Sequence, residues 1–149
     1  MAANKVWTDP GDGEFEMQLR DAALASPDEL DAMFQKLLSD LEAAPKNSNI
    51  SQKINRTLTQ YGLAKKTNGD FQEAKILLEK AVDVPPGLIE PGPLAGNLMQ
   101  LLDVCVELGL TEEAIVHGKR ALLEAKKGEF STYMIPIIEN KLKQIGASG

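Results

Sequence analysis

Apolar side chains recur along the chain at helical spacing, in seven segments separated by turns. The second segment shows the pattern clearly, because its apolar residues follow steps of three and four that place them on one side of a helix: Leu30, Met33, Phe34, Leu37, Leu38 and Leu41. The same period predicts helices over about residues 14–25, 27–44, 50–68, 71–84, 94–108, 112–127 and 131–145. The sequence therefore predicts an all-α fold.

Start and stop signals sharpen several of these boundaries. Ser26 and Asp70 each stand three residues before a Glu, as in a capping box, and Thr111 is expected to cap the sixth helix. The proline-rich stretch 84–93 predicts a connecting loop, since proline removes a backbone donor. Pro136 predicts either a kink in the last helix or a later start near Ile135.

The chain also repeats itself. Gly69-Asp70-Phe71-Gln72-Glu73-Ala74, followed by Ala81, matches Gly109-Leu110-Thr111-Glu112-Glu113-Ala114, followed by Ala121, forty residues later. Self-similarity at this spacing predicts stacked helical hairpins, which usually bind partners. Across these hairpins Gly62 is expected to face Leu78, while Leu102 faces Gly118. We interpret this as an exchange of the small and the large residue between the two sides.

The hairpins resemble the tetratricopeptide repeat family, whose repeat spans about 34 residues. The residues on the family's spacing in the first hairpin are Leu58, Tyr61, Gly62, Ala74, Leu78, Ala81 and Pro86. The second hairpin keeps Leu98, Leu101, Ala114 and Ala121. The resemblance implies a right-handed stack of antiparallel hairpins, an α-solenoid.

On this reading the chain has an acidic, flexible leader (1–13) and one helical domain (14–149). Within that domain we expect an N-terminal helix pair (14–44), a first repeat (50–86), a second repeat (94–126) and a C-terminal capping helix (131–146). The leader shows no apolar periodicity.

The resemblance also implies a function. Repeats of this family hold extended peptides or partner helices in a concave groove lined by the first helix of each repeat. Transferred by spacing, the groove residues are Arg56, Thr59, Gln60, Leu63, Lys66, Met99, Gln100, Asp103 and Val106. Members that bind the terminal carboxylate of chaperones carry Lys and Asn where Thr59, Leu63 and Met99 stand, so we predict no carboxylate clamp. The expected partner is a protein or peptide.

Charge disfavours a nucleic-acid partner. Residues 1–44 carry a net charge of −7, residues 45–90 carry +2 and the remainder carries −1. General phosphate-backbone binding would call for a basic stripe. RNA binding by helical repeats is the alternative, supported by the cations Lys53, Arg56, Lys65, Lys66, Lys75 and Lys80, which point around two helices.

Enzymatic chemistry finds little support, and no cofactor is expected. The chain has one His and one Cys, on separate predicted helices. We read His117 as a surface residue and Cys105 as a small buried hydrophobe, with a small regulatory enzyme using the two as the disfavoured alternative. The single cysteine and the absence of an apolar leader predict a cytoplasmic protein without a membrane partner. Self-association is left open.

Overall fold

The computed structural model describes residues 12–45, 47–83, 91–127 and 131–146. These residues form seven helices and no strand, which confirms the all-α prediction. The helices are α1 (Asp12–Leu24), α2 (Pro27–Glu42), α3 (Ser48–Thr67), α4 (Phe71–Val82), α5 (Pro91–Glu107), α6 (Thr111–Lys127) and α7 (Ser131–Gln144).

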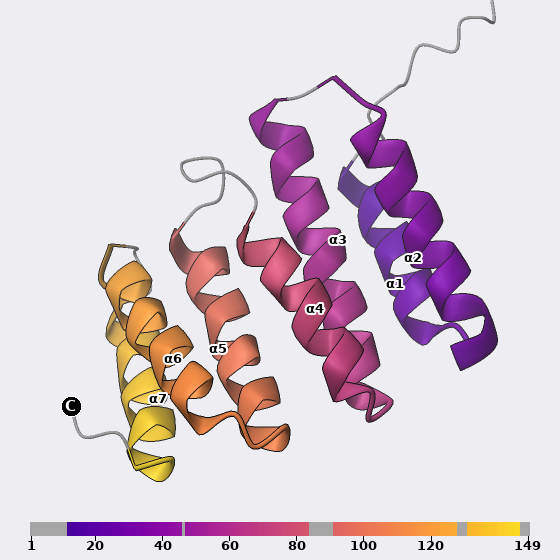
Figure 1. Cartoon of the computed structure of the whole chain (residues 1–149). Helices are drawn as coiled ribbons and strands as arrows, with labels where there is room; N and C mark the ends of the chain where they lie inside the picture. Colours follow the sequence, from indigo (N-terminus) through magenta and orange to yellow (C-terminus); the bar gives the residue numbers. More distant parts are fainter. Residues whose placement is uncertain (1–11, 46, 84–90, 128–130, 147–149) are drawn as a thin grey trace, which may run out of the picture.

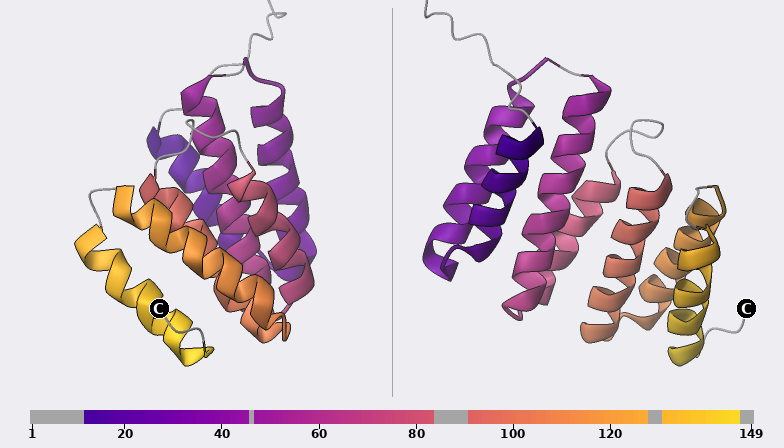
Figure 2. Two further views of the ribbon diagram at one scale, coloured as in Figure 1. Left: turned by 60° about the vertical axis from the view of Figure 1, so that its left-hand side comes forward. Right: turned by 180° about the vertical axis from the view of Figure 1, so that it is seen from behind.

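Consecutive helices run in opposite directions and lie side by side in chain order (Figure 1). Each helix packs against the next, and α3 also packs against both α1 and α5. The view from behind brings the odd-numbered helices forward, with the even-numbered helices in the layer behind them (Figure 2, right). The described chain therefore has two faces, an odd face formed by α1, α3, α5 and α7 and an even face formed by α2, α4 and α6.

Two hydrophobic cores meet at α4. Its residues Leu77 and Ala81 pack with the buried side chains of α1, α2 and α3. Ala74, Leu78 and Val82 instead pack with those of α5, α6 and α7. Because the apolar stripe of α4 is broad enough to serve both sides, this one helix joins the N-terminal and C-terminal halves.

The first hairpin turn follows the predicted chemistry. Gly69 ends α3 with a φ of +82°, in the left-handed region that glycine adopts without steric cost. Asp70 then caps α4, since its side chain accepts a hydrogen bond from the Glu73 backbone N–H at 3.4 Å. Gly109 repeats this conformation with a φ of +76° at the turn between α5 and α6. The repeated glycine thus marks the same backbone geometry twice.

Several boundary predictions were wrong. Helix α1 begins at Asp12, inside the expected leader, and α5 begins at Pro91, inside the expected loop. Prolines fit the first turn of a helix because its N–H groups have no intrahelical partner. Thr111 is the first residue of α6 rather than its cap. Helix α7 begins at Ser131, as the apolar period predicted, and continues through Pro136, so the later start near Ile135 is wrong. Residues 1–11, 84–90 and 128–130 lie outside the described part of the chain.

The cap of α2 also differs from the expected box. Ser26 occupies the N-cap position with extended backbone, but its side chain makes no hydrogen bond to the helix backbone. Its hydroxyl donates to Glu29 Oε1 at 3.1 Å instead. The start of α3, which the sequence pattern placed near Ile50, has a full cap, because Asn47 accepts from the Ile50 N–H at 2.9 Å.

Two glycines allow the helices of each hairpin to approach closely, as the exchanged pairs predicted. A Cβ added at Gly62 would lie 2.8 Å from Leu78 Cγ. At Gly118 it would lie 2.8 Å from Leu102 Cδ1 and 2.5 Å from Leu142 Cδ2. The contact between Leu102 and Gly118 confirms the prediction. Leu142 of α7 packs against the same glycine, so α7 also contacts the second hairpin at this point.

We expect Gly118→Ala to lower the free energy of unfolding by about 1–3 kcal/mol, because the added methyl group overpacks two leucines. Gly96→Ala is the matched control: Gly96 also lies within a helix, but an added Cβ meets nothing within 4 Å. That control should be neutral or stabilising, since Ala favours helix over Gly by about 1 kcal/mol. Urea denaturation of both variants measures the difference, and equal effects would refute the close-packing argument.

A polar cluster joins α2 to α3 beside the stacked rings of Phe34 and Tyr61, whose centroids lie 4.7 Å apart. The Tyr61 hydroxyl donates to Asp31, and the Lys65 ammonium lies 3.0 Å from the same carboxylate. Burial, reinforced by the bond to Asp31, raises the pKa of Tyr61 to about 12. The hydrogen bond from Tyr61 and the bond from Lys65 lower the pKa of Asp31.

This cluster should make stability depend on pH in acid. Because the pKa of Asp31 is lowered in the folded chain, its contribution is complete above the unfolded value, about 4, and is lost as the pH falls through the folded value. Asp31→Asn should therefore cost up to about 1 kcal/mol of unfolding free energy at neutral pH and less at pH ~3, below the unfolded value. Urea midpoints at both pH values test this. A cost that does not change with pH would contradict it, and Asp21→Asn, an exposed substitution on α1, is the control.

Candidate functional site

A groove of about 390 Å³ runs between α3 and α5 on the odd face. Most of the described residues that line it have polar side chains without charge, and Arg56 is the one charged residue among them. Its lining consists of Gln52, Asn55, Arg56, Thr59, Gln60, Leu63, Pro93, Gly96, Asn97 and Gln100.

The structure brings most of the predicted groove residues together, but in two places. Arg56, Thr59, Gln60, Leu63 and Gln100 line the groove itself. The others divide between a recess and the core. Lys66, Asp103 and Val106 line a separate recess of about 230 Å³ toward α7. Met99 packs against the core of the C-terminal half. Five of the nine predicted residues thus line one groove, and the other four lie outside it.

The floor of the groove is a buried amide network that links three helices. The Asn55 amide donates to the Ala81 carbonyl of α4 at 2.8 Å and to Asn97 Oδ1 of α5 at 2.7 Å. The Asn97 amide donates in turn to Thr59 Oγ1 at 2.7 Å, and that hydroxyl donates to the Asn55 carbonyl at 2.8 Å. With Asn55 and Asn97 only 4% and 3% exposed, these bonds fix the two helices that form the groove.

Arg56 joins the groove to α1. Its guanidinium donates to both carboxylate oxygens of Glu16, at 2.7 and 2.5 Å. This bidentate bond lowers the pKa of Glu16 and raises the pKa of Arg56. The positive charge at this end of the groove is thus already paired.

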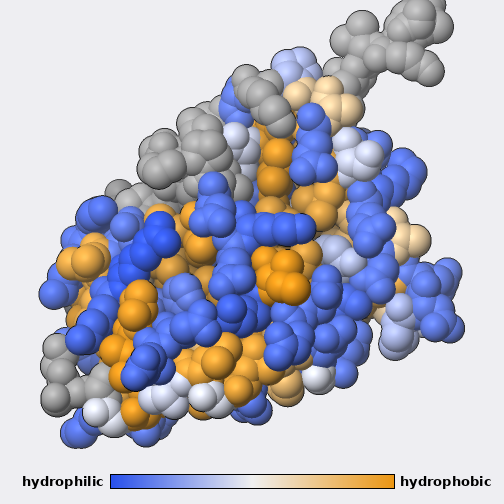
Figure 3. Space-filling model, viewed as in Figure 1, coloured by the Kyte–Doolittle hydropathy of each residue, from blue (hydrophilic) through white to orange (hydrophobic). Residues whose placement is uncertain are grey.

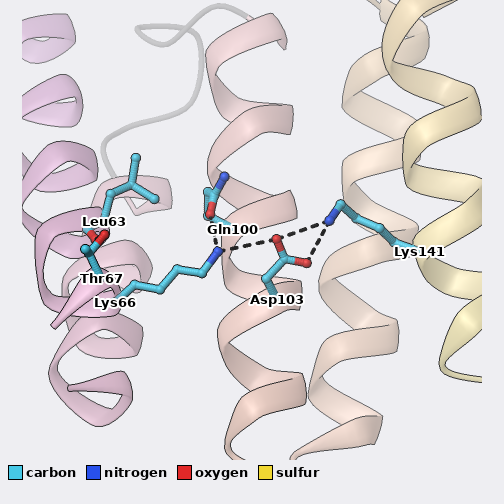
Figure 4. A network of polar contacts seen from close by, with 6 residues as sticks. All are labelled: Leu63, Lys66, Thr67, Gln100, Asp103 and Lys141. Carbon is cyan, nitrogen blue, oxygen red and sulfur yellow. Dashed lines mark hydrogen bonds and ion pairs between the residues drawn. The ribbon is translucent and has the colours of Figure 1, made fainter. Parts of the chain in front are cut away.

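A second polar cluster holds α3, α5 and α7 beside the recess (Figure 4). Lys66 donates to Gln100 Oε1 at 2.9 Å and lies 3.5 Å from the Asp103 carboxylate. Lys141 of α7 contacts the same carboxylate at 2.9 Å. Asp103 therefore acts as a bridge between two lysines from helices on either side of it.

Other cations that suggested RNA binding also contact side chains of their own chain. Lys53 is buried over the Phe15 ring, with its ammonium 5.3 Å from the centroid. Lys65 pairs with Asp31, and Lys75 pairs with Glu79 at 2.9 Å. Phosphate binding needs cations that are free to replace counterions. Five of the six cations that the RNA-binding interpretation invoked thus make contacts within the chain, and Lys80 is exposed.

The two residues of the enzyme alternative lie on different helices. Cys105 of α5 is fully buried, as predicted, and burial raises the pKa of its thiol to about 11. A thiol in this state is protonated at neutral pH and weakly nucleophilic. His117 of α6 was expected on the surface but is half-buried, and this burial lowers its pKa.

Among the described residues, no group of three or more His, Cys, Asp or Glu side chains could hold a metal ion. In the same part of the chain, every helix is too short or too polar to cross a membrane. No protein-family model matches the chain, and neither the curated proteins nor the solved structures contain a match to it.

Sequence reasoning missed the amides that form the groove floor. Asn55 and Asn97 fall outside the repeat signature, and a polar residue is usually assigned to the surface. One signal was present: Asn55 follows Ile54 and precedes Leu58 on the same helix, so it borders the apolar stripe of α3. A buried position there requires hydrogen-bond partners, which α4 and α5 supply.

We expect Asn55→Ala to cost about 1–3 kcal/mol of unfolding free energy, because it removes the donor to the Ala81 carbonyl and to Asn97 Oδ1. Thr67→Ala is the control, since Thr67 makes a local bond to the Leu63 carbonyl at an exposed site. Its cost should stay within about 0.5 kcal/mol. Urea denaturation distinguishes the two, and a similar cost for both would show that the network contributes no more than a surface bond.

Proposed function

We propose that this chain is a non-catalytic, cytoplasmic adaptor of the tetratricopeptide type, a right-handed solenoid that binds a segment of a partner protein. The groove between α3 and α5 carries the proposal. Its position between the first helices of two successive hairpins is the position that the family resemblance implies for the ligand. Its volume of about 390 Å³ suits several side chains of an extended or helical segment.

The chemistry of the groove favours a peptide over a charged small molecule. The side chains of Gln52, Gln60 and Gln100 line it. A carboxamide both donates and accepts hydrogen bonds, as a peptide backbone does. Leu63 and Pro93 add apolar surface for a side chain of the ligand. Arg56 is already bound to Glu16, so the described lining of the groove offers no unpaired cation to an anionic ligand.

The same pairing supports a groove without a carboxylate clamp. Thr59 is bound to Asn97, and Leu63 presents no donor. Lys66, the nearest ammonium along α3, contacts Gln100 and Asp103. A free chain terminus would have to displace these contacts. An internal segment of the partner, which carries no terminal charge, is therefore the ligand that we propose.

The test is selection from a random peptide library displayed in internal loops, followed by calorimetry with the recovered peptides. Gln60→Ala/Leu63→Ala should weaken binding at least about tenfold, because both side chains line the groove. The control Gln72→Ala/Ile76→Ala removes the same kinds of group from exposed positions on α4 and should bind normally.

Two results would overturn the proposal. One is full binding by the groove variant, which would place the ligand elsewhere. The other is a preference for peptides that end in a free carboxylate over the same peptides with an amidated end, which would indicate a clamp. Circular dichroism of both variants should show the helical spectrum of the unmodified chain.

A further inference from the structure

The even face carries a second hollow, a cleft of about 490 Å³. Helix α3 supplies its floor through Ile54, Leu58 and Tyr61, while α2 and α4 supply its walls. It therefore opens away from α3, on the side opposite the groove. Figure 3 looks onto this face, where apolar side chains are exposed between polar ones.

The charged residues in the walls of this cleft are predominantly acidic. Glu42 of α2, Glu73 of α4 and Asp83 at the C-cap of α4 line it, and Lys80 is the one cation among its described lining residues. Leu38 and Leu77 extend the apolar floor on either side. We call this arrangement, an apolar floor between acidic walls, the acidic cleft. It suits an apolar side chain flanked by positive charges.

Helix α6 presents a surface of that description. Val116 and Leu123 are 64% and 62% exposed and lie two turns apart, on the side of α6 opposite the buried Ala114, Gly118, Ala121 and Ala125. The exposed cations Lys119, Arg120 and Lys126 flank them and outnumber Glu112, an exposed carboxylate on that side, which lies one turn before Val116. The remaining cation of the last turn, Lys127, pairs with Glu124 at 3.2 Å. We call Val116, Lys119, Arg120, Leu123 and Lys126 the basic stripe.

We propose that two copies of the chain pair through these surfaces, with the basic stripe of one copy in the acidic cleft of the other. The two surfaces match in both apolar content and charge. The stripe cannot reach the cleft of its own chain, because α4, α5 and α6 pack against one another in order and hold the two apart. The partner that complements each surface is therefore a second copy.

Symmetry strengthens this assignment. The cleft lies between α2 and α4 and the stripe lies on α6, so both surfaces belong to the even face. A two-fold axis that lies in the plane between two facing even faces makes both contacts at once. Such an axis closes the assembly as a dimer instead of extending it as a fibre. The groove on the odd face stays open, so each dimer would present two grooves.

Charge reversal on each surface tests the pairing by sedimentation equilibrium at low salt. The unmodified chain should pass from monomer to dimer mass as its concentration rises, and added salt should weaken the dimer. Lys119→Glu/Lys126→Glu and Glu42→Lys/Asp83→Lys should each weaken it at least about tenfold, because like charges then meet in both contacts. A mixture of the two variants should restore the dimer, since opposite charges meet in both contacts of the mixed pair.

Charge-matched reversals at exposed positions elsewhere are the controls. Arg20→Glu/Lys143→Glu matches the first change, and Asp21→Lys/Glu139→Lys matches the second. Both controls should dimerise as the unmodified chain does. The proposal fails if the unmodified chain stays monomeric up to millimolar concentration, if the controls lose the dimer equally, or if the mixture stays monomeric. A partner of another kind in the cleft would produce the first or the last of these outcomes.

Discussion

Helix α4 is buried against two hydrophobic cores at once, and the rest of the structure depends on this constraint. Leu77 and Ala81 serve the N-terminal core, whereas Ala74, Leu78 and Val82 serve the C-terminal core. A short helix can face two cores only if small residues let its neighbours come close. Gly62 on α3 meets that need on one side, where Leu78 fills the space of its missing side chain. The two faces of the molecule, with their separate hollows, follow from this shared helix.

The pattern of apolar residues predicted the seven helices because each helix buries one stripe, as the second does with Leu30, Phe34 and Leu41. It also predicted the contact between Leu102 and Gly118, since a hairpin pairs residues equally distant from its turn. Boundaries near proline were predicted less well. Pro91 and Pro136 signal a break by composition, yet Pro91 begins α5 and Pro136 lies inside α7, because the effect of proline depends on its place along the helix.

The groove was only partly predictable for a different reason. Spacing along α3 identifies side chains that point to one side, and Arg56, Thr59 and Gln60 do line the same groove. Pairing across helices depends on how far one helix is rotated against the next, and one sequence does not reveal this. Met99 packs against the core, and Asp103 forms ion pairs with two lysines. The amides of the floor were missed because their burial exists only in the assembled hairpins.

The Asn55–Asn97 network has a consequence for how the hairpins align along their length. Apolar contacts are non-directional, so apolar burial alone discriminates between registers less sharply than hydrogen bonds do. Two amides, a hydroxyl and a backbone carbonyl are all satisfied in one longitudinal register only. The network therefore fixes the register of the second hairpin relative to the first. It does so by burying polar groups at positions where apolar ones would have fitted.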